Sequence, residues 1–252
     1  MAANRLTDIV GRTDVLNIPL HSLDEADIAS AVDGLLDGTG TRQIMLLRWW
    51  DLMRIRVDRE LRRCSRELAL SLPVSRSLVF GARFLRRQHP PRHLPFDFTI
   101  RLLGALEDKQ RSVYILGGTP VSLRIVEQNL RETFPGLRFV GRYSGYYNKI
   151  VEPDIVTAIR KAGPDFILLG GGLAAGDKWI SRQGREFGTC ITLYSPETFD
   201  IFSEKRKRTS RAAFRRGVDF IPGLIRRPWR ILWFPVFLWY LILLLLFKIF
   251  RS

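Results

Sequence analysis

Two stretches of similar design decide the fold: residues 112–118 read SVYILGG, and residues 164–172 read PDFILLGGG. Each is a short apolar run that ends in consecutive glycines and precedes a segment with helical spacing of its apolar residues. Such runs are typical of strands that are buried on both faces of a sheet. We therefore predict two buried strands, each of which ends at a glycine turn that leads into a helix.

The chain between and around these strands alternates between helical and strand patterns. Residues 119–136, TPVSLRIVEQNLRETFPG, predict an amphipathic helix with Thr119 as its N-cap and Pro120 at its first position. A last strand is expected in residues 188–195. Alternating strands and helices predict an α/β domain over residues 1–203, with a mainly parallel sheet covered by helices on both faces.

The charge of the chain is concentrated near its C-terminus. The formal net charge is +15, and residues 204–252 hold twelve Lys/Arg against two acidic residues, leaving only +5 for residues 1–203. Because the excess adjoins an apolar run, it favours an anionic membrane over a nucleic acid as the partner. Residues 1–10 lack the apolar core of a secretory signal, so we expect the main domain to stay on the cytoplasmic side of the inner membrane.

The C-terminal region divides into a basic juxtamembrane segment, residues 204–230, and a hydrophobic membrane segment, residues 231–250. Seventeen residues, 231–247, carry no charge, which is at the short end of the length that a spanning helix needs. The preceding basic cluster is expected to bind anionic headgroups with about 1 kcal/mol per Lys/Arg. A tail-anchored transmembrane helix is the favoured expectation, and a monotopic hairpin or in-plane helix is the alternative.

No metal or redox chemistry is indicated by the cysteines and histidines. Cys64 and Cys190 lack metal-ligand spacing and are expected to be buried thiols. His21, His89 and His93 do not cluster with carboxylates or cysteines at such spacing. We expect no cofactor and no metal site.

The two glycine clusters admit two interpretations. At the carboxyl ends of strands, glycines let backbone amides and a helix N-terminus approach a phosphate, which favours a nucleotide-type ligand. Glycine-ended strands also arise wherever a tight turn is needed. Asp177, just past the second cluster, either faces such a ligand or complements the dipole of the following helix.

The central block is similar to a known family. Residues 113–147, VYILGGTPVSLRIVEQNLRETFPGLRFVGRYSGYY, and 164–182, PDFILLGGGLAAGDKWISR, resemble the WecG/TagA/CpsF glycosyltransferases (glycosyltransferase family 26). The resemblance extends weakly over residues 15–230. It implies a Rossmann-like sheet and transfer of an N-acetylmannosamine-like hexose from a UDP-sugar to an undecaprenyl-diphosphate-linked sugar in surface polysaccharide biosynthesis. A basic C-terminal appendage would hold such an enzyme to the membrane.

The resemblance also implies site residues. The candidate UDP-sugar-binding residues are Gly117, Gly118, Thr119, Gly145, Tyr146, Gly170 and Gly172. Arg92, Arg226 and Arg227 are the candidates for binding the lipid diphosphate. An arginine fork suits phosphate oxygens.

Several family motifs are altered in this chain. The Asp of the family's Pro-Asp-Gly, its candidate general base, falls on Val74, and its Thr-x-Asn falls on residues 46–48. Its Pro-Lys-Gln-Glu falls on residues 174–177. Only the final acidic residue is retained there, as Asp177 in place of Glu. Asp97 and Asp177 are therefore the remaining candidates for the catalytic base.

Two functions follow from this pattern. The first is a divergent membrane glycosyltransferase that uses Asp97 or Asp177 as its base. The second is a catalytically inactive relative that acts as a scaffold or partner of polysaccharide-assembly proteins, with Arg48 and Arg76 in the former site. The lost motif residues favour the second, and the kept glycines favour the first.

Overall fold

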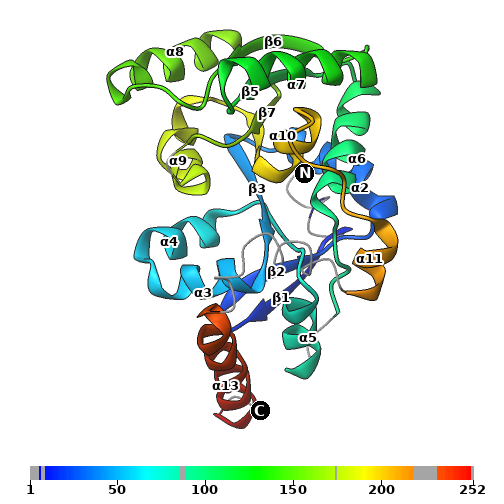
Figure 1. The fold of residues 1–252 in the computed structure, drawn as a ribbon, viewed down its shortest axis with the longest axis vertical. Helices are drawn as coiled ribbons and strands as arrows, with labels where there is room; N and C mark the ends of the chain where they lie inside the picture. The colour runs from blue at the N-terminus through cyan, green and yellow to red at the C-terminus, as the bar shows by residue number, and fades with distance from the viewer. Residues whose placement is uncertain (1–5, 7–8, 86–88, 174, 218–231, 251–252) are drawn as a thin grey trace.

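The two glycine-ended runs form adjacent strands. β5 (Ser112–Leu116) and β7 (Phe166–Leu169) pair in parallel, and their last residues stand opposite each other. Every side chain of both strands is buried. The computed structural model describes residues 6, 9–85, 89–173, 175–217 and 232–250 (Figure 1).

These strands belong to a six-stranded parallel sheet with the order β4-β3-β8-β7-β5-β6. The other four strands are β3 (Thr41–Leu47), β4 (Leu70–Pro73), β6 (Arg138–Tyr143) and β8 (Cys190–Tyr194). A separate antiparallel hairpin, β1 (Gly11–Val15) and β2 (Ile18–Ser22), contacts the β4 edge. The predicted α/β class with a parallel sheet is confirmed.

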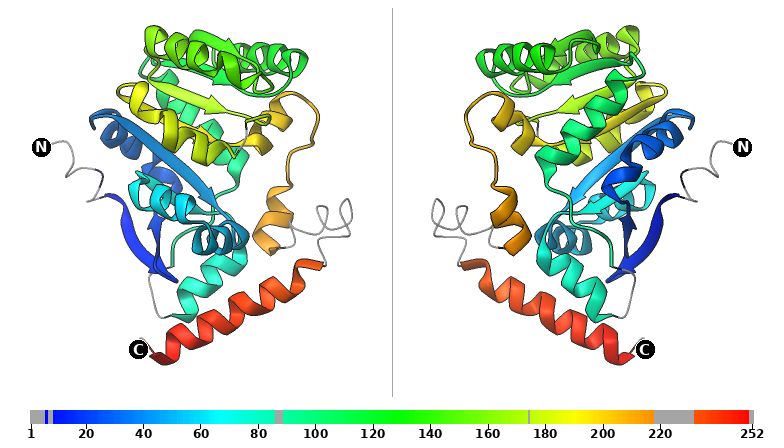
Figure 2. Two further views of the ribbon diagram at one scale, coloured as in Figure 1. Left: turned by 90° about the vertical axis from the view of Figure 1, so that its left-hand side faces the viewer. Right: turned by 90° about the vertical axis from the view of Figure 1, so that its right-hand side faces the viewer.

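Helices cover both faces of the sheet (Figure 2). One face packs against α2 (Ile28–Leu36), α6 (Pro95–Glu107), α7 (Pro120–Thr133) and α10 (Pro196–Phe202). The other packs against α8 (Glu152–Ala162) and α9 (Gly176–Gln183). A third apolar cluster joins the hairpin to α3 (Trp49–Val57), α4 (Arg59–Glu67), α5 (Arg76–Phe84) and α13 (Phe234–Phe250). The short α11 (Arg211–Arg216) follows α10.

The predicted start of α7 is confirmed. Thr119 caps the helix: its side chain accepts a hydrogen bond from the amide of Ser122, and Pro120 occupies the first turn. Such a cap stabilises a helix by about 1 kcal/mol. The N-terminus of α7 therefore begins at a defined residue, immediately after the glycine turn that ends β5.

The expectation of a transmembrane helix is wrong. Among the helices of the described residues, none combines the length and the apolar character needed to cross a bilayer. α13 contains most of the apolar run, and its Tyr240, Leu243 and Leu244 are buried against the domain. The Tyr240 hydroxyl donates a hydrogen bond to the carbonyl of Ser77 at 2.9 Å. The apolar run therefore has a second explanation, because one side of α13 packs on the domain.

His21 ties the hairpin to the sheet and makes stability depend on pH. Its Nδ1 accepts the amide hydrogen of Ser71 at 3.0 Å, while the Ser71 hydroxyl donates to the carbonyl of Pro19 at 2.6 Å. Burial, and next the charge of Arg12, lower the pKa of His21 to about 4. The folded protein therefore keeps this imidazole neutral at a pH where the unfolded chain protonates it.

We predict that the free energy of unfolding falls as pH drops from about 6.5 to about 4, because only the unfolded chain gains the proton at His21. The contribution is at most roughly 3 to 4 kcal/mol, at roughly 1.4 kcal/mol for each unit by which the pKa is lowered. His21→Asn keeps an acceptor for Ser71 and should flatten this slope in urea unfolding measured between pH 4 and 7. His89→Asn, at an exposed histidine, is the matched control and should keep the wild-type slope. An unchanged slope in His21→Asn would contradict the assignment.

Candidate active site

The carboxyl ends of β5 and β7 lie where the chain changes direction. After β5 the chain runs through α7 to β6 at the sheet edge, and after β7 it runs through α9 to β8 on the opposite side. α7 and α9 pack on opposite faces of the sheet. In open α/β sheets such a switch point is where ligands bind. The site is therefore sought in the loops at this edge.

The glycine loops at the switch point hydrogen-bond to one another. The amide of Gly118 donates to the carbonyl of Gly171 at 2.7 Å, and the amide of Gly145 donates to the carbonyl of Gly118 at 3.0 Å. The amide of Gly170 donates to the carbonyl of Leu116 at 2.8 Å. Three loops, after β5, β6 and β7, are thereby held as one unit. These amides are used inside the protein, which supports the tight-turn interpretation of the glycines.

The same loops approach so closely that side chains are excluded. A Cβ at Gly117 would lie 2.5 Å from the backbone of Gly170, and one at Gly145 would lie 2.3 Å from the carbonyl oxygen of Gly171. Gly117 also has φ +150°, which L side chains rarely adopt. The glycines are required by backbone packing, whatever ligand the edge binds.

An exposed aromatic ring covers this loop unit. A Cβ at Gly172 would lie 2.8 Å from the ring of Tyr146, so the ring lies directly against this glycine. Tyr146 is 65% exposed, which is unusual for a large aromatic side chain beside a tightly packed loop. The edge thus offers a flat aromatic surface on which a planar group could stack.

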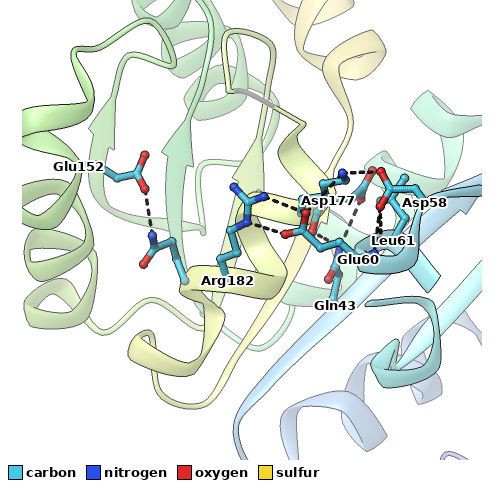
Figure 3. Close-up of polar contacts among 9 residues, drawn as sticks. Gln43, Asp58, Glu60, Leu61, Glu152, Asp177 and Arg182 are labelled. Carbon is cyan, nitrogen blue, oxygen red and sulfur yellow. Dashed lines mark hydrogen bonds and ion pairs between the residues drawn. The ribbon is translucent and has the colours of Figure 1, made fainter. Parts of the chain in front are cut away.

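Asp177 lies in the first turn of α9, against β3 (Figure 3). The side-chain amide of Gln43 donates to the backbone carbonyl and to the carboxylate of Asp177, both at 3.3 Å. Burial, followed by the negative charge of Asp51, raises the pKa of Asp177 to about 7. A carboxylate with this pKa can take a proton near neutral pH and release it again.

Asp51 lies at the start of α3, just after β3. Its carboxylate accepts the amide hydrogen of Arg48 at 3.0 Å, which forms a cap for the helix. Burial raises the pKa of Asp51, and hydrogen bonding to Arg48 opposes that rise. Asp51 and Asp177, from two different elements, thus form a pair of interacting acids.

Tyr194, which was missed in the sequence analysis, lies next to this pair. It is the last residue of β8, and a Cβ at Gly176 would lie 2.3 Å from its ring, so this glycine makes room for it. Its pKa is raised by burial and then by the charge of Asp177. Its position near the end of the strand predicted over residues 188–195 is the signal that could have identified it.

An ion-pair network holds α9, and with it Asp177, against α4 (Figure 3). Lys178 pairs with Asp58 and Glu60, and Arg182 forms two hydrogen bonds to the carboxylate of Glu60, at 2.5 and 2.8 Å. Asp58 also caps α4, because its side chain accepts the amide hydrogen of Leu61. The fork of Arg182 on a carboxylate is geometrically specific, so it fixes the orientation of α9.

The basic segment folds back on the domain. We call residues 204–217 the basic strap. Asp97, in the first turn of α6, accepts hydrogen bonds from Arg208 at 3.1 Å and from Arg211 at 2.6 Å. Glu197, at the start of α10, pairs with Arg206 at 3.2 Å and with Arg48. Two carboxylates therefore each hold two guanidinium groups, and the strap lies along α6 and α10.

Arg92 also contacts the strap. Its Nε donates to the carbonyl of Val74 at 3.0 Å, its Nη1 donates to the carbonyl of Phe214 at 3.1 Å, and its guanidinium lies 4.0 Å from the centre of the Phe214 ring. Val74, at the position of the family's acid, is buried. Position 74 therefore provides no carboxylate that could act as a base.

The predicted site residues thus fall into two groups. The glycines, Tyr146 and Asp177 lie along the switch-point side, with Tyr194 next to Asp177. Asp97 and Arg92 contact the basic strap, and no hydrogen bond or ion pair among the described residues joins Asp97 to Asp177. Arg226 and Arg227 lie outside the described residues. Within the part of the chain that the structure describes, no cluster of three His, Cys, Asp or Glu side chains could hold a metal ion.

Comparison with known proteins adds a family to this geometry. Residues 13–252 match the family described as Glycosyl transferase WecG/TagA/CpsF family. The chain belongs to this family. A relative from Bacillus subtilis (strain 168), an N-acetylglucosaminyldiphosphoundecaprenol N-acetyl-beta-D-mannosaminyltransferase, is 23% identical over 159 residues. A relative of the same name from Staphylococcus aureus (strain NCTC 8325 / PS 47) is 20% identical over 132 residues.

The match to these relatives is partial. It covers 63% of this chain and 61% of the Bacillus subtilis relative, and 51% of both chains for the Staphylococcus aureus relative. The chain thus matches between half and about three fifths of the length of these curated relatives. Membership of a glycosyltransferase family follows from the match, and the sugars that this chain uses are a separate question.

We predict that Gly117→Ala and Gly145→Ala destabilise the protein by roughly 3 kcal/mol or more, because each new methyl group meets backbone atoms that cannot move independently. Thermal unfolding measures this effect. Gly171→Ala is the matched control in the same loop unit, since its Cβ would meet nothing within 4 Å. Equal melting temperatures for all three variants would contradict the packing role of the glycines.

Proposed function

We propose that the chain is a glycosyltransferase that moves an N-acetylmannosamine-like hexose from a UDP-sugar to an undecaprenyl-diphosphate-linked sugar, in surface polysaccharide biosynthesis. The family match supports the reaction class. The names of the relatives support the type of donor sugar and acceptor. The observation on which the proposal rests is Asp177, in the first turn of α9, a carboxylate whose burial raises its pKa to about 7.

In the proposed reaction Asp177 is the general base. Its carboxylate accepts the proton of the acceptor hydroxyl, whose oxygen attacks the anomeric carbon of the donor sugar. The bond from that carbon to the UDP oxygen breaks, and UDP leaves with the electron pair. Gln43 positions the carboxylate, and burial, followed by the charge of Asp51, keeps the pKa of Asp177 high enough for the proton transfer.

The donor is proposed to lie along the switch-point loops. Tyr146 offers its exposed ring for stacking with the uracil base. The diphosphate would lie towards the N-terminus of α7, where the helix dipole is favourable to negative charge. The role of the seven predicted donor-binding residues stays a prediction.

The acceptor is proposed to lie near the basic strap. Several cationic side chains of the strap are exposed, and these are Lys205, Lys207, Arg208, Arg211, Arg215 and Arg216. Such a group of cations suits the diphosphate of a lipid-linked sugar. Because that acceptor is membrane-bound, the enzyme is proposed to work at the cytoplasmic face of the inner membrane.

A second function is favoured by specific contacts. Both carboxylate oxygens of Asp97 are engaged by arginines, Arg48 is paired with Glu197, and Val74 replaces the family's acid. A protein with this arrangement could serve as an inactive partner of polysaccharide-assembly proteins. The two functions differ in whether a sugar nucleotide binds.

Titration with UDP and UDP-N-acetylmannosamine by calorimetry separates these functions. The enzyme should bind both at micromolar to millimolar concentration, and no heat at millimolar ligand would leave only the partner function.

In a transfer assay with a lipid-linked acceptor, Asp177→Asn should lower kcat by roughly 10²- to 10⁴-fold, the usual contribution of a general base. If Asp97→Asn lowers kcat instead and Asp177→Asn does not, the base is Asp97.

The pH profile supplies an independent prediction. Since Asp177 must be ionised to act, kcat should rise with pH around 7 and level off above it. Asp51→Asn removes a negative charge and lowers the pKa of Asp177, so it should move this rise to lower pH while keeping the plateau. Asp154→Asn, at an exposed acid on α8, is the control and should leave the profile unchanged. An unshifted rise in Asp51→Asn would contradict the coupling of the two acids.

A further inference from the structure

The loop after β6 carries two neighbouring tyrosines with different surroundings. Tyr146 is largely exposed, and its ring lies against Gly172. Tyr147 is half-buried, and its ring packs against the apolar cluster that includes Trp179 of α9. The ring that is proposed to stack with the uracil base is therefore one residue away from a ring on the side of α9, the helix that carries Asp177.

A single carboxylate joins Tyr147 to the end of α9. The Tyr147 hydroxyl donates to Oε2 of Glu152 at 3.3 Å, and the side-chain amide of Gln183 donates to Oε1 of Glu152 at 2.9 Å. Glu152 begins α8, and Gln183 is the last residue of α9. Burial, and next the charge of Glu152, raise the pKa of Tyr147, so the hydroxyl keeps its proton and remains a donor. Glu152 thus uses both oxygens to link the loop to the helix.

α9 is held by carboxylates on two sides (Figure 3). Arg182 is bound by Glu60 of α4, and the next residue, Gln183, is bound by Glu152 of α8. With eight residues, α9 is only about 12 Å long, and Asp177 lies in its first turn. Because so short a helix moves as a rigid element, contacts at its last residues also set the position of its first turn.

A helix-capping role alone does not account for the contacts of Glu152. An acid in the first turn of a helix is favoured by the helix dipole, and α8 has two such acids, Glu152 and Asp154. Asp154 is exposed, and no hydrogen bond or ion pair within the described part of the chain involves its side chain. The two acids share a position relative to the dipole and differ in their links to other elements, so they form a matched pair.

We propose that Glu152 is a positioning residue that fixes the donor loop, residues 143–147, relative to Asp177. Through Tyr147 it orients the neighbouring Tyr146, and through Gln183 it places α9. Reacting groups must be held about 3 to 3.5 Å apart in the correct orientation, so a link between these two parts of the site matters for catalysis. The inference rests on the proposed function, in which Tyr146 receives the uracil base and Asp177 is the general base.

Calorimetry with UDP on the full chain tests the role of Glu152. Glu152→Ala should raise the Kd for UDP on the order of tenfold, because two hydrogen bonds to a charged group are lost and the loop is no longer held. Glu152→Gln can still bond to both partners and should bind nearly like wild type. Asp154→Ala is the matched control and should leave the Kd unchanged. A wild-type Kd for Glu152→Ala, or an equal loss in Asp154→Ala, overturns the proposal.

Gln183→Ala tests whether the link reaches from α9 to the donor loop. Although Gln183 lies at the far end of α9 from Asp177, this variant should raise the Kd for UDP by roughly three- to tenfold. In the Glu152→Ala background the same change should have no further effect, because the link is already broken. Gln128→Ala, at an exposed glutamine of α7, is the control and should bind like wild type. Independent, additive effects of Glu152→Ala and Gln183→Ala overturn the link.

Hydrogen–deuterium exchange without ligand separates this inference from the proposed function. Gln183→Ala should speed exchange in residues 143–147, although their sequence is unchanged, and Gln128→Ala should not. Unchanged exchange in this loop overturns the link whether or not UDP binds. If the wild type binds no UDP, the proposed function fails, and the role of Glu152 in donor positioning fails with it. The exchange result still decides whether Glu152 joins the loop to α9.

Discussion

The close packing of three glycine loops at the carboxyl ends of β5, β6 and β7 is the constraint on which the site depends. The amide of Gly118 donates to the carbonyl of Gly171, and the amide of Gly145 donates to the carbonyl of Gly118, so that hydrogen bonds join the three loops. Side chains are excluded at Gly117 and Gly145 by backbone atoms of neighbouring loops. Since α7 and α9 follow from two of these loops, the loops also set where both helices begin. The position of Asp177 at the start of α9 follows from this packing.

Two charged regions of the domain supply different chemical groups, one acidic and one basic. On one side two interacting acids, Asp51 and Asp177, favour a proton acceptor that works near neutral pH. On the other side Asp97 and Glu197 hold the arginines of the basic strap. An enzyme that transfers a hexose from a sugar nucleotide to a lipid-diphosphate-linked sugar, with release of the nucleotide, needs both a base and cations. The division therefore agrees with the proposed reaction, in which the strap serves the acceptor and Asp177 serves the attacking hydroxyl.

Much of the fold could be predicted from local patterns. Buried strands β5 and β7, the cap of α7 at Thr119 and the last strand β8 each have a signal within a few residues. The basic residues 49–67 form two helices, α3 and α4, because the side chain of Asp58 caps the second helix. A side chain that can cap a helix offers the backbone an alternative to continuing the helix. The spacing of apolar residues alone does not show whether the helix ends there.

The misjudged features depend on contacts between distant segments. The apolar run near the C-terminus suggested a spanning helix, because its sequence does not show that Tyr240 would seat on Ser77 and Gly81. The basic segment was expected to bind anionic headgroups, and nothing in its own sequence shows that Asp97 and Glu197 hold its arginines on the domain. Similarly, the influence of Asp51 on Asp177 joins residues 126 positions apart in the chain. Such pairs follow from the tertiary structure and have no local signature.

Hydrogen–deuterium exchange of the full chain with and without UDP tests most directly the claim that the carboxyl edge binds a sugar nucleotide. The account predicts slower exchange on adding UDP in residues 143–147, around Tyr146, and in the first turn of α9, with α4 unchanged. Unchanged exchange in both regions at saturating UDP, or protection confined to other parts of the sheet, would contradict it.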